Sequence, residues 1–161
     1  MKNQLLVDLL ILNNYKISFA ESCTGGLLVS KIVEIPSASK VLDMSFVTYA
    51  EKAKVELIGV KQETIDQYGV VSEEVAKEMA IGVANEANSN IGVAVTGIAG
   101  PTGGTKLKPV GMVCFGICIN NQIFTYTKQF GNIGRTNVRE ESVKFIINTL
   151  VELLKVDGMW N

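Results

Sequence analysis

Short apolar segments of strand length alternate along this chain with longer amphipathic segments, and this alternation restricts the possible folds more than any other feature. We expect strands at residues 16–20, 45–50 and 91–96, and a hairpin of strands 110–119 and 122–130 that turns at Asn120-Asn121. We expect helices at residues 3–14, 24–35, 51–58, 72–88 and 136–155. Strands that alternate with helices predict an α/β fold with a sheet covered on both faces, and the late hairpin makes that sheet mixed.

The length and composition indicate one globular domain over residues 1–161. Hydrophobic residues make up 47% of the 161 positions, which is enough for a sizeable core. The net charge of −1 gives no electrostatic basis for binding nucleic acid or an anionic membrane. The N-terminal stretch MKNQLLVDLLILNN contains Asp8 and is typical of an amphipathic helix, not of a signal peptide. Three cysteines, an odd number, favour a reducing cytoplasmic location.

The chain contains no histidine, and this excludes whole classes of mechanism. A Ser-His-Asp or Cys-His mechanism cannot operate within this chain. Most zinc and non-haem iron sites are also disfavoured, since histidine is their commonest ligand. If the protein is a hydrolase, its base is Lys, Glu, Asp, Tyr or water.

The stretch AESCTGG, residues 20–26, joins an expected strand to an expected helix. Such a turn aims backbone N–H groups, here those of Thr24, Gly25 and Gly26, at one point, where they can hold a phosphate or an oxyanion beside a nucleophile. The alternative is that Ser22 or Thr24 only caps the helix and the glycines allow close packing.

The stretch TGIAGPTGGTKLKP, residues 96–109, follows the strand expected at 91–96 and is richer in glycine than a simple turn requires. Its Gly100-Pro101 and Gly103-Gly104 pairs can expose several N–H groups and form an anion nest. It matches neither the P-loop nor the GxGxxG spacing. The alternative is a flexible surface loop without a role.

Two further stretches carry basic residues. In TYAEKAK, residues 48–54, Tyr49 closes a strand, and Lys54 becomes the leading candidate for a general base in a chain without histidine. In GNIGRTNVRE, residues 131–140, Arg135 and Arg139 lie at a helix start, where a cation is electrostatically disfavoured and an incoming anion is a reasonable partner. The alternatives are solvated lysines and a surface arginine paired with Glu140 or Glu141.

In their order along the chain, these stretches resemble the CinA C-terminal-domain family. The resemblance also rests on FVTYAEKAKVELIGV, YGVVSEEVAKEMA and the continuation of the glycine-rich loop to PVGMV. The resemblance covers about residues 3–155. It implies a three-layer α/β/α sandwich with a mixed, mostly parallel sheet. It also implies hydrolysis of the carboxamide of nicotinamide mononucleotide to nicotinate mononucleotide and ammonia, without a cofactor, in a homodimer. Some members carry a second domain similar to molybdopterin-binding proteins, whose activities are not carried over to this chain.

The family pattern implies roles for individual residues. Ser22 is the expected nucleophile, Lys54 its base and Tyr49 a site residue, while Thr96, Gly97 and Thr105 match the loop that lines the site. With Gly100 in the same loop, they are expected to bind substrate. Arg135 is the expected contact for a substrate anion, although the family usually has an acidic residue or Asn directly before this arginine, where this chain has Gly134.

Other interpretations remain open at this point. Cys23 competes with Ser22 as nucleophile, because Glu21, Cys23 and Lys54 would resemble a nitrilase triad and a thiol at a helix N-terminus can be activated. A non-catalytic nucleotide-binding or regulatory module would use the same nests without turnover. A nucleic-acid-associated role is suggested by the family's name alone, and the near-neutral charge argues against it.

Overall fold

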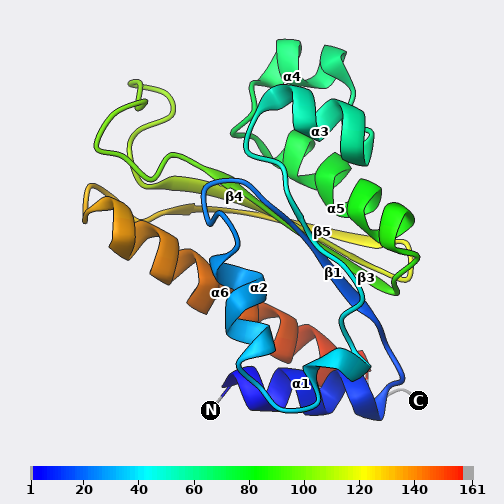
Figure 1. The fold of residues 1–161 in the computed structure, drawn as a ribbon. Helices are drawn as coiled ribbons and strands as arrows, with labels where there is room; N and C mark the ends of the chain where they lie inside the picture. The colour runs from blue at the N-terminus through cyan, green and yellow to red at the C-terminus, as the bar shows by residue number, and fades with distance from the viewer. Residues whose placement is uncertain (1, 158–161) are drawn as a thin grey trace.

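A single mixed sheet organises the protein, whose computed structural model describes residues 2–157. The strand order is β2-β1-β3-β4-β5 (Figure 1). The strands are β1 (Ile17–Glu21), β2 (Phe46–Val47), β3 (Ile91–Gly97), β4 (Met112–Ile119) and β5 (Gln122–Gln129). β1 pairs in parallel with β2 and β3, and β4 pairs antiparallel with β3 and β5. Four of the five strands therefore run in one direction, and the predicted mixed, mostly parallel sheet is confirmed.

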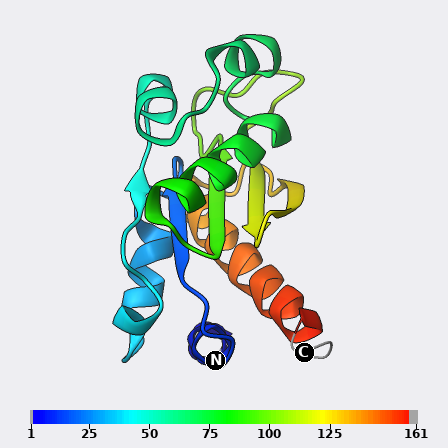
Figure 2. The ribbon, with the colours of Figure 1, turned by 90° about the vertical axis from the view of Figure 1, so that its right-hand side faces the viewer.

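Helices cover both faces of this sheet, as expected for a three-layer sandwich. α3 (Glu51–Ile58), α4 (Gln62–Tyr68) and α5 (Glu73–Ala87) lie on one face, and α1 (Lys2–Leu12), α2 (Leu27–Val33) and α6 (Arg135–Asp157) lie on the other (Figures 1 and 2). A short 3₁₀ helix, Ala38–Lys40, follows α2. No helix within residues 2–157 is both long enough and apolar enough to cross a membrane.

The two faces of the sheet pack in different ways. On the α6 face, large side chains such as Phe19, Phe115 and Leu150 form the main core. On the other face, α5 approaches so closely that a Cβ atom at Gly92 would lie 2.1 Å from the carbonyl oxygen of Ala80, and one at Gly116 would lie 2.3 Å from that of Ala76. Glycine at these positions lets the helix backbone rest directly on β3 and β4.

Local signals in the sequence predict several boundaries correctly. α3 begins at Glu51 and ends at Ile58, with Gly59 in the left-handed conformation (φ 71°). The Ser72 hydroxyl accepts the Val75 N–H at the start of α5, as a helix cap should. Asn120 and Asn121 both have positive φ, which produces the tight hairpin between β4 and β5.

Three elements differ from the expectation. β2 is only two residues long, Phe46–Val47, where a strand over residues 45–50 was expected, so Tyr49 follows this strand instead of closing it. α4 was not predicted, and its seven residues, QETIDQY, contain a single fully buried side chain, Ile65, so their apolar periodicity is weak. α2 begins at Leu27, three residues later than expected, because residues 22–26 form a turn. That turn is central to the site described below.

The topology brings four chain segments to one edge of the sheet. β1, β2 and β3 are parallel, so their carboxyl ends meet there, followed by Ser22, Thr48 and Ile98 respectively. The N-terminus of α6 lies beside the same edge, since Arg135 contacts the chain that follows β3. In open α/β sheets, the carboxyl ends of the strands are the usual place for a ligand.

Candidate active site

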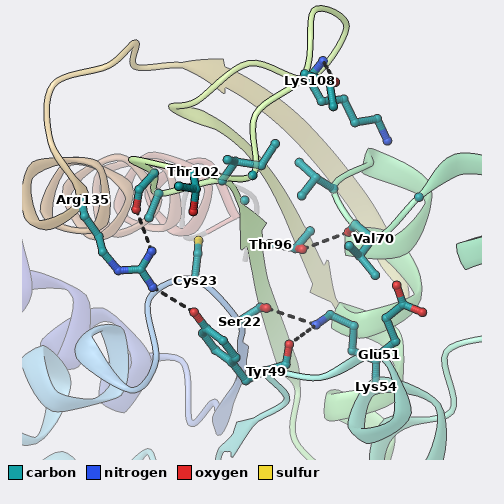
Figure 3. Close-up of a pocket in the computed structure, with 18 residues that line it drawn as sticks. Ser22, Cys23, Tyr49, Glu51, Lys54, Val70, Thr96, Thr102, Lys108 and Arg135 are labelled. Atoms are coloured by element: carbon teal, nitrogen blue, oxygen red, sulfur yellow. Dashed lines mark hydrogen bonds between the residues drawn. The ribbon is translucent and has the colours of Figure 1, made fainter.

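A cavity of about 430 Å³ opens at this edge of the sheet. Its wall is formed by the residues after β1, β2 and β3, the start of α3, the segment before α5 and the first residue of α6 (Figure 3). Eight residues expected at the site line this cavity: Ser22, Tyr49, Lys54, Thr96, Gly97, Gly100, Thr105 and Arg135. Residues expected from separate stretches of sequence are thus brought together by the fold.

Lys54 lies against Ser22 inside this cavity (Figure 3). The Lys54 side chain is only 1% exposed, and its Nζ atom is 3.1 Å from Ser22 Oγ. The same Nζ donates to the carbonyl oxygens of Thr48, at 2.6 Å, and Tyr49, at 3.4 Å. Because carbonyl oxygens only accept, these bonds fix two N–H groups of Lys54. In the neutral amine, the lone pair is then left to face the Ser22 hydroxyl.

The surroundings of Lys54 favour this neutral form. Removal from solvent lowers the pKa of Lys54 below its ordinary value of 10.5, while electrostatic interactions with Cys23 and Glu51 act in the opposite direction. Desolvation is the larger of these effects. An amine of lowered pKa beside a serine hydroxyl can act as a general base in place of histidine.

Cys23, the competing nucleophile, has the opposite tendency. Its side chain is buried, and desolvation is the largest influence, raising the pKa of the thiol from 9.0 to about 12. The thiolate, which is the reactive form, is therefore scarce at neutral pH. The expected activation by a helix N-terminus is wrong, because the first N–H groups of α2 are already occupied.

Glu21, a member of the nitrilase-like triad considered from the sequence, accepts these N–H groups. Its carboxylate is 1% exposed and accepts the N–H groups of Gly26 at 3.2 Å, Leu28 at 2.8 Å and Val29 at 2.9 Å. Glu21 therefore caps α2 from the end of β1, so the expectation that Ser22 or Thr24 caps this helix is also wrong. An acidic residue between a buried strand and a glycine pair was the available signal for this role.

Arg139, in the second helical turn of α6, binds the backbone of the same 22–26 segment. Its Nε donates to the Cys23 carbonyl oxygen at 3.1 Å and its Nη2 to the Thr24 carbonyl oxygen at 2.8 Å. A surface ion pair with a neighbouring glutamate was one expectation for this arginine, but within the described part of the chain it forms none. Arg139 instead fixes the backbone directly after Ser22.

The expected binding role of Thr24, Gly25 and Gly26 therefore needs correction. None of the three lines the cavity. The Gly26 N–H is bound to Glu21, and the Gly25 N–H donates to the Ser22 carbonyl oxygen at 3.0 Å. These residues shape the turn that presents Ser22, and the N–H groups of Gly25 and Gly26 are bound within the protein instead of forming the expected anion cradle.

Arg135 and Tyr49 close another part of the cavity wall. Arg135 donates from Nη1 to the Gly100 carbonyl oxygen at 2.8 Å and from Nη2 to the Tyr49 hydroxyl at 2.9 Å (Figure 3). Arg135 thereby joins α6 to the glycine-rich loop and to the segment after β2. Its expected contact with a substrate anion stays a prediction.

Several residues of the wall were not predicted from the sequence. Glu51 lies at the start of α3, Val70 precedes α5, and Lys108 ends the glycine-rich loop. Thr96 joins the end of β3 to the segment before α5, because its hydroxyl donates to the Val70 carbonyl oxygen at 2.9 Å. No three His, Cys, Asp or Glu side chains within residues 2–157 gather into a group that could hold a metal ion.

The fold and the site together define a three-layer α/β domain with a buried Ser–Lys pair in an open cavity. The sequence profile of the CinA C-terminal domain matches residues 2–154, and the chain belongs to this family. A CinA-like protein from Fervidobacterium nodosum is 51% identical over 125 residues, which cover 78% of this chain and 31% of that protein. Another from Kosmotoga olearia is 45% identical over 145 residues, covering 90% and 35%. The chain thus spans about a third of the length of these curated relatives.

Solved structures show the same architecture. The competence/damage inducible protein CihA from Agrobacterium tumefaciens superposes with a TM-score of 0.88 at 38% identity, covering 95% of this chain and 96% of that one. A competence-damaged protein (CinA) superfamily protein from Escherichia coli gives a TM-score of 0.91 at 34% identity, covering 94% and 88%. The similarity thus extends over nearly the whole of each solved chain.

Proposed function

We propose that this protein is an amidohydrolase that converts nicotinamide mononucleotide to nicotinate mononucleotide and ammonia. The observation that carries the proposal is the 3.1 Å contact between Lys54 Nζ and Ser22 Oγ in the cavity wall. The remaining Lys54 contacts leave its lone pair directed at the hydroxyl. The substrate comes from the family resemblance stated above, and the cavity suits a molecule of its kind, with aromatic, cationic and backbone N–H groups in one wall.

In the proposed first half-reaction, neutral Lys54 accepts the Ser22 hydroxyl proton as Oγ attacks the carboxamide carbon. The carbonyl π electrons move to oxygen, and the N–H groups of Ala99 and Gly100, which donate to no acceptor among residues 2–157, stabilise the oxyanion. Collapse of this intermediate breaks the C–N bond. The Lys54 ammonium gives its proton to the departing nitrogen, which leaves as ammonia, and an ester on Ser22 remains.

In the second half-reaction, water attacks the ester carbon while Lys54 accepts one of its protons. The C–O bond to Ser22 then breaks, and the proton on Lys54 returns to Ser22 Oγ. The new carboxylic acid gives the second proton of that water to solvent, and nicotinate mononucleotide is released as the carboxylate. Tyr49 offers an aromatic face to the cationic pyridinium ring, and the positive charges in the cavity wall favour the substrate's anionic phosphate.

A buried Ser–Lys contact favours catalysis over simple binding, because a binding module has no use for a lysine of lowered pKa against a hydroxyl. The test is ammonia release from nicotinamide mononucleotide by the purified protein, with free nicotinamide as the control. We expect turnover of the nucleotide far above that of nicotinamide. Tight binding of the nucleotide without ammonia release would instead support a regulatory module.

A further inference from the structure

Lys108 lies in the wall of the cavity at a distance from the reacting groups. Figure 3 shows it across the cavity from Ser22 and Lys54, at the end of the glycine-rich loop. Its ammonium donates to the Tyr68 carbonyl oxygen. The chain leaves room for it there, because a Cβ atom at Gly69 would lie only 2.8 Å from Lys108 Nζ.

Among residues 2–157, the charge of Lys108 has no ionic partner. In the part of the chain that the structure describes, Lys108 forms no ion pair, although Glu73 and Glu74 line the adjoining hollow that it shares. Tyr68 takes one of its three N–H donors. Two donors and a full positive charge therefore remain for a ligand.

The other cations of the cavity are engaged differently. Lys54 directs its donors to Thr48 and Tyr49 and lies against the Ser22 hydroxyl, and Arg135 binds Gly100 and Tyr49. Lys108 is the cation of this wall whose donors are least committed to the protein. An anion that enters the cavity gains most by binding there.

The backbone of the loop supports this assignment. The Thr105 N–H donates to the Lys108 carbonyl oxygen at 2.8 Å, and the Lys108 N–H donates to Thr105 Oγ1 at 3.0 Å, which closes a turn under the lysine. Thr102 and Gly103 line the same cavity, and their N–H groups donate to no acceptor among residues 2–157. Gly103 has φ 89°, a conformation that allows successive N–H groups to form an anion nest.

We propose that Lys108, with the N–H groups of this loop, binds the phosphate of the nucleotide and makes the site selective for a nucleotide over the corresponding nucleoside. This inference rests on the proposed function, since it assigns the anionic end of the same substrate. Arg135 then acts mainly on Tyr49 and the loop. The phosphate group and the carboxamide are held at opposite sides of the cavity.

The experiment measures equilibrium binding by calorimetry in the S22A background, where turnover does not interfere. Nicotinamide mononucleotide and nicotinamide riboside are titrated into S22A, S22A/K108M, S22A/R135M and S22A/K106Q. Lys106 is the matched control, because it lies on the same loop, is exposed and does not line the cavity. Circular dichroism and the melting temperature show that each variant is folded.

We expect K108M to weaken nucleotide binding ~10- to 100-fold, as for loss of a charge-assisted contact. The loss for the riboside should be at least about tenfold smaller, and K106Q should match its parent. Equal losses for both ligands, or a phosphate-selective loss in R135M with none in K108M, would overturn the assignment to Lys108. Absence of nucleotide binding to every protein, together with no ammonia release by the wild type, would instead refute the proposed function itself.

Discussion

Replacing Glu21 with Gln tests whether this carboxylate organises the turn that carries Ser22. Oε1 accepts two N–H groups, from Gly26 and Leu28, and Oε2 accepts that of Val29. In E21Q, the side-chain NH₂ takes the place of one oxygen and meets a backbone donor, so at least one hydrogen bond is lost. A bond to a charged group contributes about 1.5–3 kcal/mol, and relief from burying the charge offsets part of this loss. We expect the free energy of unfolding to fall by about 1.5–2.5 kcal/mol.

Urea denaturation followed by circular dichroism measures this change, with an unaltered m value as the check that the same transition is observed. E34Q is the matched control, because Glu34 directly follows the same helix, is exposed and forms a surface ion pair with Lys31 at 3.0 Å. The control should cost less than about 0.5 kcal/mol. If E21Q is no more destabilising than E34Q, the capping role of Glu21 is wrong.

The remaining predictions concern the reacting groups and the turn that carries Ser22. The value of kcat/KM should rise with pH through the Lys54 pKa, which lies below 10.5, and then level off; a profile that falls over this range would contradict a neutral base. In the same window the unfolded state binds more protons at Lys54 than the native state, so the free energy of unfolding in urea titrations should also rise with pH. C23A should keep ammonia release within about twofold of wild type, because the buried thiol stays protonated; a loss of about a hundredfold would return Cys23 to the mechanism. R139M should lower kcat about tenfold or more with little change in KM, and R139K should recover part of the loss; an effect on KM alone would show that Arg139 does not position Ser22.

Much of the fold could be predicted because its signals are local. The Ser72 cap, the left-handed Gly59 and the Asn120-Asn121 turn each depend on a few neighbouring residues. The long α6 has regularly spaced apolar positions, and its buried side chains include Ile146 and Leu150. α4 lacked such a signal because one buried residue in seven gives no periodicity.

The candidate site was predictable in part for a different reason. The sequence stretches that resemble the family identified Ser22, Lys54 and Arg135, and parallel strands brought them to one edge of the sheet. The role of Arg139 depends on how α6 packs beside the turn after β1, more than a hundred residues away in sequence. Lys108 was missed because a lysine on a loop is ordinarily solvated, and only the folded loop places it in the cavity wall.

The role of the AESCTGG turn also could not be predicted fully from the local sequence. Its small residues and glycines do form a tight turn that presents Ser22. Whether its N–H groups face a ligand or the protein depends on where the Glu21 side chain lies, which no local pattern determines. Because Glu21 is buried at the end of β1, its carboxylate accepts N–H groups at the start of α2, and these groups face the protein.

Ammonia release from nicotinamide mononucleotide by S22A tests the central claim most directly. The proposed mechanism places the covalent intermediate on Ser22 Oγ, with Lys54 Nζ 3.1 Å away as its base. The account predicts that S22A, folded and still able to bind the nucleotide, loses about a thousandfold or more of the wild-type rate. A rate within about tenfold of wild type would contradict it.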